Sequence, residues 1–270
     1  MTPSPQPADA VPALAGRVVL VIGGAHGLGR SITATLARAG AHVALTSRDE
    51  AEATTAAAEV EALGGRASAF ELDLRERRDP DRVVARVLDE LGRIDGLVCN
   101  SGISGPSAPV WEVDDASWDE VLAVNLTGTF SCIRAVAPSM VAAGRGSIVV
   151  VGSMTGKRPL QHRSPYAASK LALVGLCRTL ALDLGEHGVR INVVSPGFVS
   201  GARLDWLLEA QAQVRGTDQD AARAAALERT PLRRFTDPED VAATVAFLTG
   251  DAAAGITGAD VDVSSGLVLA

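Results

Sequence analysis

Short runs rich in β-branched residues alternate with Ala-rich segments along most of the chain, and few folds accommodate such a pattern. Seven runs have the composition of buried strands and lie at 17–22, 42–47, 67–72, 94–99, 146–151, 189–194 and 259–263. Three segments between the first four runs, at 28–40, 49–65 and 79–92, are predicted helices, and each ends at glycine. Alternation at this spacing favours βαβ units. We therefore expect an α/β fold, with a doubly wound parallel sheet of about seven strands and helices on both faces.

The 270 residues contain no internal repeat and no interdomain linker, which predicts one domain over 14–270. Residues 1–13 are rich in Pro and Ala and are expected to form a flexible tail. The segment at about 198–230 follows the sixth strand as an irregular insertion with a helical bias, and it includes Trp206. It is expected either to close over an apolar ligand as a lid or simply to pack on the body.

Composition excludes several classes of function. The net charge of -7 gives no basic footprint for nucleic acid or for anionic lipid. No apolar run approaches the roughly 18 residues of a membrane-spanning helix, and the first residues lack the features of a signal peptide. Cys99, Cys132 and Cys177 form neither a CxxC pair nor a metal-ligand spacing. These features predict a cytoplasmic protein with buried free thiols and no metal site.

A glycine-rich turn separates the first predicted strand from the first predicted helix. Gly23, Gly27 and Gly29 form the pattern G-x-x-x-G-x-G. Such a turn lets the backbone approach a pyrophosphate, while the helix N-terminus supplies partial positive charge and free N–H groups. Glycine turns alone are weak evidence, but a strand before and a helix after are the context that supports dinucleotide binding.

The end of the second strand bears on the choice of coenzyme. A carboxylate at its tip would bind the adenosine ribose hydroxyls and repel a 2′-phosphate. The tip is Ser47, followed by Arg48, and a hydroxyl beside a guanidinium suits a phosphate dianion. This favours NADP(H) over NAD(H). In the alternative interpretation Arg48 is a solvated surface charge and Asp49 is the ribose ligand, so NAD(H) stays possible.

The only tyrosine of the chain, Tyr166, stands four residues before Lys170. On a helix these two positions share one face. A phenol titrates near pH 10 in water, and a neighbouring ammonium lowers that value by stabilising the phenolate. Tyr166 is therefore a candidate acid/base, although a half-buried tyrosine beside a surface lysine is also common. Ser153 strengthens the first interpretation because it follows the fifth strand, at the sheet edge where doubly wound folds bind ligands.

Three further polar side chains are candidates for the same region. Asn100 follows the fourth strand at that edge. Asn125 lies in a long, apolar helical stretch, where an amide needs a partner such as a backbone carbonyl or an ordered water. Asp73 follows the third strand and is either an acceptor for an adenine amino group or a turn residue.

Taken in order, these motifs resemble those of the short-chain dehydrogenase/reductase family over roughly residues 14 to 270. The matching features are the glycine turn, N-x-G at Asn100 to Gly102, the helix with Asn125, Ser153 thirteen residues before Tyr166, Y-x-x-x-K, and P-G at Pro196 and Gly197. One departure is Ile22, which stands where the family has a threonine that braces the glycine turn. The resemblance implies a Rossmann-type sheet.

The resemblance also implies a role for each matching residue. Tyr166 is then the acid/base, Lys170 binds the nicotinamide ribose and tunes Tyr166, Ser153 orients the substrate carbonyl, and Asn125 anchors a water of a proton relay. The implied coenzyme-binding residues are Gly23, Gly27, Leu28, Gly29, Ser47, Arg48, Asp73, Leu74, Asn100, Gly102, Tyr166, Lys170, Pro196, Gly197 and Val199. The implied reaction is reduction of a ketone to a secondary alcohol by hydride transfer.

The substrate is expected between segments 101–111, 154–163 and 198–230, and a small ketone or alcohol is the first candidate. Alternatives are an NAD-dependent secondary alcohol dehydrogenase, a 3-oxoacyl-[acyl-carrier-protein] reductase-like enzyme, an imine reductase and a non-catalytic nucleotide-binding sensor. Glu186 beside His187 argues mildly against a docking patch for an acidic carrier. The resemblance implies a homotetramer, formed through helices at about 115–143 and 165–186 and the last strand. No nucleic-acid or membrane partner is expected.

Overall fold

The computed structural model describes residues 13–269. Its sheet has seven parallel strands in the order β3-β2-β1-β4-β5-β6-β7. The strands are β1 (Val18–Ile22), β2 (His42–Ser47), β3 (Arg66–Glu71), β4 (Gly96–Cys99), β5 (Gly146–Val151), β6 (Val189–Pro196) and β7 (Asp260–Val263). Each lies within two residues of its predicted bounds, so the predicted doubly wound sheet is confirmed. The tail expected at 1–13 lies outside the described residues, apart from Ala13.

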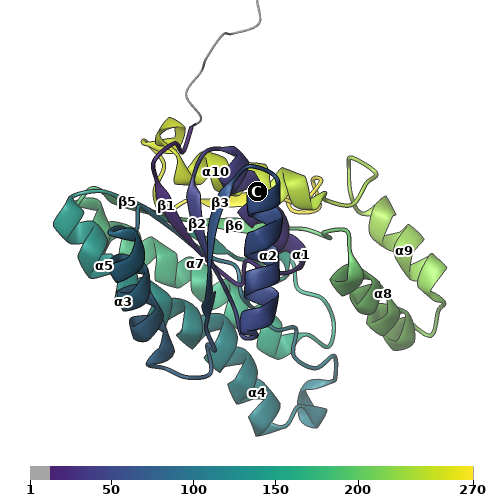
Figure 1. The fold of residues 1–270 in the computed structure, drawn as a ribbon. Helices are drawn as coiled ribbons and strands as arrows, with labels where there is room; N and C mark the ends of the chain where they lie inside the picture. Colours follow the sequence, from purple (N-terminus) through teal and green to yellow (C-terminus); the bar gives the residue numbers. More distant parts are fainter. Residues whose placement is uncertain (1–12, 270) are drawn as a thin grey trace, which may run out of the picture.

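Helices cover both faces of this sheet (Figure 1). One face packs against α1 (Gly27–Arg38), α2 (Glu50–Ala62) and α10 (Pro238–Thr249). The other packs against α3 (Asp79–Leu91), α5 (Thr129–Ala143) and α7 (Ser164–Gly185). The five inner strands are largely buried on both sides, which explains why they read as mostly apolar runs, whereas the edge strands β3 and β7 keep partly exposed residues. Val, Ile, Leu and Ala fill most of the two cores, as the low aromatic content predicts.

The strand order reverses beside β1, which pairs with β2 on one side and with β4 on the other. Residues that follow β1 and β4 therefore meet at the carboxyl edge of the sheet. The Asn100 side chain donates a hydrogen bond of 2.9 Å to the Gly23 carbonyl across this junction. Doubly wound folds bind their ligands at such a reversal, so the topology fixes the position of the site.

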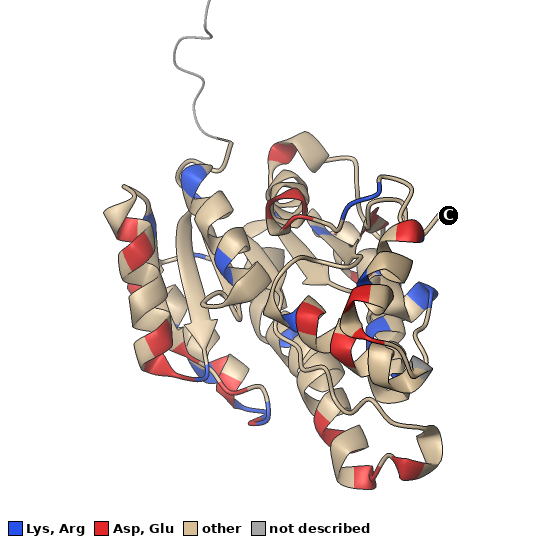
Figure 2. Cartoon of the chain, turned by 90° about the vertical axis from the view of Figure 1, so that its right-hand side faces the viewer, with Lys and Arg blue, Asp and Glu red and all other residues tan. Residues whose placement is uncertain are grey.

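The segment at 198–230 is more regular than the sequence predicts. It forms two helices, α8 (Ala202–Arg215) and α9 (Gln219–Glu228), which project from the carboxyl edge of the sheet (Figures 1 and 2). Leu204 and Leu208 of α8 are buried in a small third core with Phe198 and Phe235. These contacts anchor the pair to the body, and the closure of this segment over a ligand stays a prediction.

The stretch from 115 to 143 differs from the sequence expectation in two ways. It consists of α4 (Asp115–Leu122), a π-helical turn (Ala123–Gly128) and α5, so Asn125 lies in a wide turn and not in regular α-helix. By length and composition alone this helical stretch could cross a membrane, contrary to the absence of any such run expected above. Half of its most apolar window is buried against the rest of the protein, and buried core helices commonly pass the same test.

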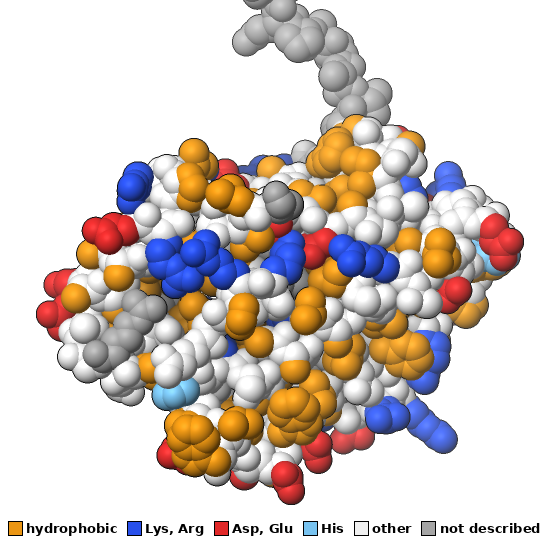
Figure 3. Space-filling model, turned by 180° about the vertical axis from the view of Figure 1, so that it is seen from behind, with side chains coloured by type: hydrophobic (Ala, Val, Ile, Leu, Met, Phe, Trp, Pro, Cys, Tyr) orange, Lys and Arg blue, Asp and Glu red, His pale blue; other side chains and the backbone are white. Residues whose placement is uncertain are grey.

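The shorter helical elements are η1 (Val110–Glu112), α6 (Met154–Lys157) and η3 (Asp251–Ala253). Large apolar side chains remain exposed on α4, α5 and α7, among them Trp118, Phe130, Leu171 and Leu182. Figure 3 shows apolar side chains gathered at the lower end of the rear face, the end at which Figure 1 draws α4. The three cysteines are buried free thiols, as predicted, and burial raises the pKa of Cys132 and of Cys177 to about 12.

Candidate active site

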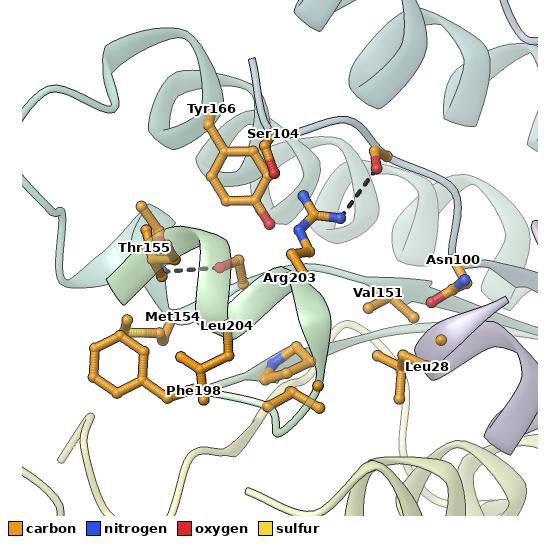
Figure 4. Close-up of a pocket in the computed structure, with 18 of the residues that line it drawn as sticks. Leu28, Asn100, Ser104, Val151, Met154, Thr155, Tyr166, Phe198, Arg203 and Leu204 are labelled. Atoms are coloured by element: carbon orange, nitrogen blue, oxygen red, sulfur yellow. Dashed lines mark hydrogen bonds between the residues drawn. The ribbon is translucent and has the colours of Figure 1, made fainter. Parts of the chain in front are cut away.

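The loops after β1, β4, β5 and β6 surround a cavity of about 460 Å³ at the carboxyl edge of the sheet (Figure 4). Most of the predicted site residues line it: Gly23, Gly27, Leu28, Asn100, Gly102, Ser153, Tyr166, Lys170, Pro196, Gly197 and Val199. The others, Gly29, Ser47, Arg48, Asp73, Leu74 and Asn125, lie outside its wall. The helix α8 closes one side, and it adds Arg203, Leu204 and Trp206 to the lining.

The glycine turn forms a cradle in which side chains at Gly23 and Gly29 would clash. Gly23 and Gly27 have φ values of 75° and 47°, in the left-handed region. A Cβ on Gly29 would lie 1.9 Å from the Gly23 carbonyl oxygen, so the helix approaches the turn too closely for a side chain. The threonine missing at Ile22 has a substitute, because the Thr46 hydroxyl accepts a 3.1 Å hydrogen bond from the Gly23 N–H.

No side chain caps the N-terminus of α1, because His26 at the cap position makes no such hydrogen bond. The first N–H groups of the helix are therefore free of a side-chain partner, and they carry the positive end of the helix dipole. A bare glycine backbone and an uncapped helix N-terminus together fit a pyrophosphate. The residues present thus fit a dinucleotide at this edge of the sheet.

The tip of β2 holds a carboxylate that sequence reasoning missed. Glu52 of α2 accepts a hydrogen bond of 3.0 Å from the Ser47 hydroxyl, and the His26 Nε2 lies 2.6 Å from the same carboxylate oxygen. The contacts with His26 and Ser47 lower the pKa of Glu52. Asp49 caps α2 by accepting from the Ala51 N–H, whereas the side chain of Arg48 is exposed.

Asp73 and Leu74 lie further along the edge, beyond the cavity. The Asp73 carboxylate accepts a hydrogen bond of 3.0 Å from the Arg75 N–H and lies 3.4 Å from the Arg75 guanidinium. Asp73 therefore stabilises the turn after β3. Leu74 is buried, and it packs so closely on Gly128 of the π-helical turn that a Cβ there would lie 2.8 Å from the leucine Cβ. Their predicted contacts with adenine remain a prediction.

Asn125 ties two walls of the site together. Its side-chain amide is fully buried, accepts from the Ile103 N–H at 2.8 Å and donates to the Ile103 carbonyl at 3.0 Å. The same amide nitrogen donates to the Ser169 hydroxyl at 3.0 Å. The partner that a buried amide requires is therefore a backbone carbonyl, one of the two options expected. Asn125 holds the loop after β4 against α7, and the relay water remains a prediction.

Tyr166 and Lys170 occupy the first turns of α7, on the face directed at the cavity. Pro165 suits this helix start because its missing N–H needs no partner there. Lys170 is buried; its Nζ donates to the Val151 carbonyl at 2.8 Å and lies 5.9 Å from the centre of the Tyr166 ring. Burial lowers the pKa of Lys170, and the nearby Arg203 acts in the same direction.

Ser153 follows β5 by two residues and lines the cavity. It caps the short helix α6, with its oxygen accepting a hydrogen bond of 3.1 Å from the Thr155 N–H. That contact uses only the oxygen of Ser153, so its hydroxyl proton is available to the Tyr166 oxygen or to a substrate oxygen. The serine is thus held in place by one hydrogen bond and is able to make another with an oxygen beside Tyr166.

Two arginines that sequence reasoning missed act on the Tyr166 phenol. Burial raises its pKa, but Arg203, Lys170, a hydrogen bond from Ser153 and Arg163 together outweigh burial and leave the pKa below its ordinary value. The Arg163 and Arg203 guanidinium carbons lie 5.0 and 5.4 Å from the ring centre. Arg203 thus contributes more than the helical neighbour Lys170, from which the sequence predicted the effect. Figure 4 shows its side chain reaching from α8 to the tyrosine.

Comparison with known proteins places this geometry among oxidoreductases. A family model described as Enoyl-(Acyl carrier protein) reductase matches residues 23–268. A 3-oxoacyl-[acyl-carrier-protein] reductase of Thermotoga maritima is 34% identical over 95% of this chain and 99% of its own length. The NAD+-bound structure of a xylitol dehydrogenase is 30% identical, with a TM-score of 0.90 and coverage of 94% of this chain and 99% of that one.

A second solved structure carries the other form of the coenzyme. It is described as an NAD(P) dependent gluconate 5-dehydrogenase from Beutenbergia cavernae, with NADP bound at low occupancy. It is 35% identical to this chain, with a TM-score of 0.86, and covers 96% of this chain and 99% of its own. The similar structures thus include both NAD+ and NADP complexes.

Proposed function

Because the chain belongs to the short-chain dehydrogenase/reductase family, we propose that Tyr166 is its catalytic acid/base and that NADP(H) is its preferred coenzyme. The enzyme is an oxidoreductase that acts on C=O and CH–OH groups. The nicotinamide, when bound, supplies or accepts the hydride. The observation that carries the proposal is the Tyr166 phenol, which is aimed into the cavity beside Ser153 and has a lowered pKa.

The residues divide into those that bind and those that move a proton. The glycine turn and the first N–H groups of α1 would hold the pyrophosphate, with Asn100, Asp73 and Leu74 toward the adenosine half. Pro196, Gly197 and Val199 would border the nicotinamide, and Lys170 its ribose. In the direction of reduction, Ser153 donates a hydrogen bond to the ketone oxygen and the Tyr166 hydroxyl gives that oxygen its proton. The surrounding cations stabilise the phenolate that remains.

The pH dependence of alcohol oxidation reports on Tyr166. Oxidation needs the phenolate, so its rate is full above the tyrosine pKa and is lost as the pH falls through it. Since Arg203 lowers that pKa, Arg203→Met should move the acidic limb of the kcat profile to higher pH. Arg223→Met is the matched control, because it removes a guanidinium from α9 outside the cavity. An unchanged limb in Arg203→Met would contradict the assignment.

The preference for NADP(H) rests on the end of β2. Arg48 is exposed there, and within 13–269 no carboxylate forms an ion pair with it, so its guanidinium is free to meet a 2′-phosphate. Glu52 favours the alternative of an NAD-dependent dehydrogenase, because its carboxylate at the same tip would repel that phosphate. The two side chains therefore give opposite expectations that can be tested separately.

We expect Arg48→Gln to raise the KM for NADPH about tenfold or more and to change the KM for NADH little, since a charge-assisted contact is lost only with the phosphate. Glu52→Gln should lower the KM for NADPH. Steady-state kinetics with both coenzymes measure these effects. An unchanged KM for NADPH in Arg48→Gln would contradict the role of Arg48 in the preference for NADP(H). Equal use of NADH by the wild type would contradict the preference itself.

A substrate bound to an acyl-carrier protein is the second candidate. Relatives described as 3-oxoacyl-[acyl-carrier-protein] reductases are similar to almost the whole chain. The site expected for a basic docking patch holds Glu186, which is exposed and lies 3.5 Å from the His187 ring. An acidic carrier would meet a carboxylate at this point, which supports a small ketone as the substrate. Rates with an acyl-carrier thioester and with small ketones separate the two.

We also propose that the enzyme is a cytoplasmic homotetramer. Phe130 of α5, Leu171 and Leu182 of α7 and Trp118 of α4 are exposed apolar side chains on helices that a second copy would cover. The buried free thiols are what a reducing compartment permits. Sedimentation or light scattering of the purified protein measures the number of copies.

A further inference from the structure

The cavity carries only positive formal charge. Arg163, Lys170 and Arg203 line it, and none of the described lining residues is Asp or Glu. The chain as a whole has a net charge of -7, and both acidic and basic residues occur along the elements drawn in Figure 2. The segregation of cations into this cavity is therefore a local feature of the site and does not reflect the composition of the chain.

Arg163 is the less expected of these cations, because its side chain is buried. The residue is 4% exposed, and its guanidinium carbon lies 5.0 Å from the centres of both the Tyr166 and the Trp206 rings. Among the described residues its side chain makes one hydrogen bond, to the Gly105 carbonyl, and that bond is long at 3.4 Å. Burial lowers the pKa of Arg163 to about 10. A buried guanidinium with most of its five donors unused is costly unless an anion completes it.

Arg203 approaches the same phenol from the other wall. It belongs to α8, donates a hydrogen bond of 3.1 Å to the Gly102 carbonyl and lies 5.4 Å from the centre of the Tyr166 ring. No carboxylate in the described part of the chain forms an ion pair with Arg163 or with Arg203. Two planar donor groups thus flank the tyrosine that faces the reacting oxygen, and both lack an anionic partner.

We propose that the substrate is a small oxo acid (or the corresponding hydroxy acid), whose carboxylate binds Arg163 and Arg203 while its ketone oxygen faces Tyr166 and Ser153. This inference rests on the proposed function and names its substrate class. The planar forks of arginine match the two oxygens of a carboxylate. Both arginines lie close to the Tyr166 ring, so the carboxylate must be only a few bonds from the ketone, as in a 2-oxo or 3-oxo acid.

A bound carboxylate also has a consequence for the chemistry. By neutralising Arg163 and Arg203 it removes part of the positive field that lowers the pKa of Tyr166. Binding of the acid should therefore raise the pKa of Tyr166 in the complex, while Lys170 remains to stabilise the phenolate that forms.

The direct test compares each acid with its neutral methyl ester. We expect kcat/KM for 2-oxobutanoate or 3-oxobutanoate to exceed that of the matching ester by about ten- to a hundredfold, the usual effect of charge-assisted contacts. Arg163→Met and Arg203→Met should each lower the ratio of kcat/KM for the acid to kcat/KM for its ester by about tenfold or more, mainly through the KM for the acid. Any loss of rate caused by removing a cation beside Tyr166 is common to both substrates and cancels in this ratio. Arg223→Met is the control and should leave the ratio unchanged.

Binding of unreactive ligands covers the case in which the variants fail to fold or in which none of the panel is turned over. Butanoate should bind the coenzyme complex of the wild type more tightly than butanamide does, as followed by protein fluorescence, because Trp206 adjoins Arg163. Equal affinity of the two ligands, or an ester used as well as its acid, would overturn the proposal and leave the reductase function standing. Undiminished turnover by Tyr166→Phe would overturn the reductase mechanism itself.

Discussion

Tyr166→Phe should lower kcat for ketone reduction by about 10²–10⁴-fold, the usual contribution of a general acid/base, while the coenzyme Kd stays within about twofold. The substitution removes only the hydroxyl, so the ring keeps its place among Arg163, Lys170 and Arg203. Steady-state rates followed by absorbance of the reduced coenzyme measure the first quantity, and fluorescence titration measures the second.

Ser153→Ala is the companion variant for this experiment. Its effect should be smaller than that of Tyr166→Phe, because the serine orients the ketone oxygen and does not supply the proton. The alanine also removes the cap of α6, so thermal unfolding must be compared with the wild type. Retention of wild-type kcat by Tyr166→Phe would show that another group supplies the proton.

Gly29→Ala should have the second large effect, on both folding and coenzyme binding. The added Cβ would lie 1.9 Å from the Gly23 carbonyl oxygen and 2.7 Å from the Asn100 side-chain nitrogen, so the turn must open. We expect the free energy of unfolding to fall by about 1–3 kcal/mol, as for other overpacked sites, and the coenzyme Kd to rise about tenfold or more.

Gly255→Ala is the matched control for that substitution. Nothing lies within 4 Å of the position a Cβ would take at Gly255, and its φ is not in the left-handed region. Urea unfolding and coenzyme titration should therefore give wild-type values for this variant. Wild-type coenzyme affinity in Gly29→Ala would show that the glycine cradle does not bind the dinucleotide.

The fold could be predicted because most strands and helices are marked by residues within them or next to them in the sequence. The inner strands are largely buried on both faces, so they appear in the sequence as short, mostly apolar runs, and several of the helices between strands begin or end at glycines or capping residues. The placement of Ser153, Tyr166 and Lys170 at one edge follows from the same signal. Strand order and helix spacing are enough to bring these three residues together.

The charges around the phenol were not predictable in the same way. Arg163 and Arg203 are 40 positions apart, and they meet only because α8 folds back over the start of α7. An arginine in a loop or on a helix is usually solvated, so nothing in its sequence neighbourhood marks it. Glu52 was missed for a related reason, because only the turn between β2 and α2 places its carboxylate at Ser47. Tertiary placement of long polar side chains leaves no periodic pattern.

Nearby cations make the Tyr166 phenol more acidic than that of an ordinary tyrosine, and the pKa of this phenol can be measured directly. Tyr166 is the only tyrosine, so the ultraviolet absorbance of tyrosinate reports on this one group. A pH titration of the wild-type protein should show a midpoint below the ordinary value of about 10, and Tyr166→Phe should abolish the transition. A wild-type midpoint at or above that value would contradict the account.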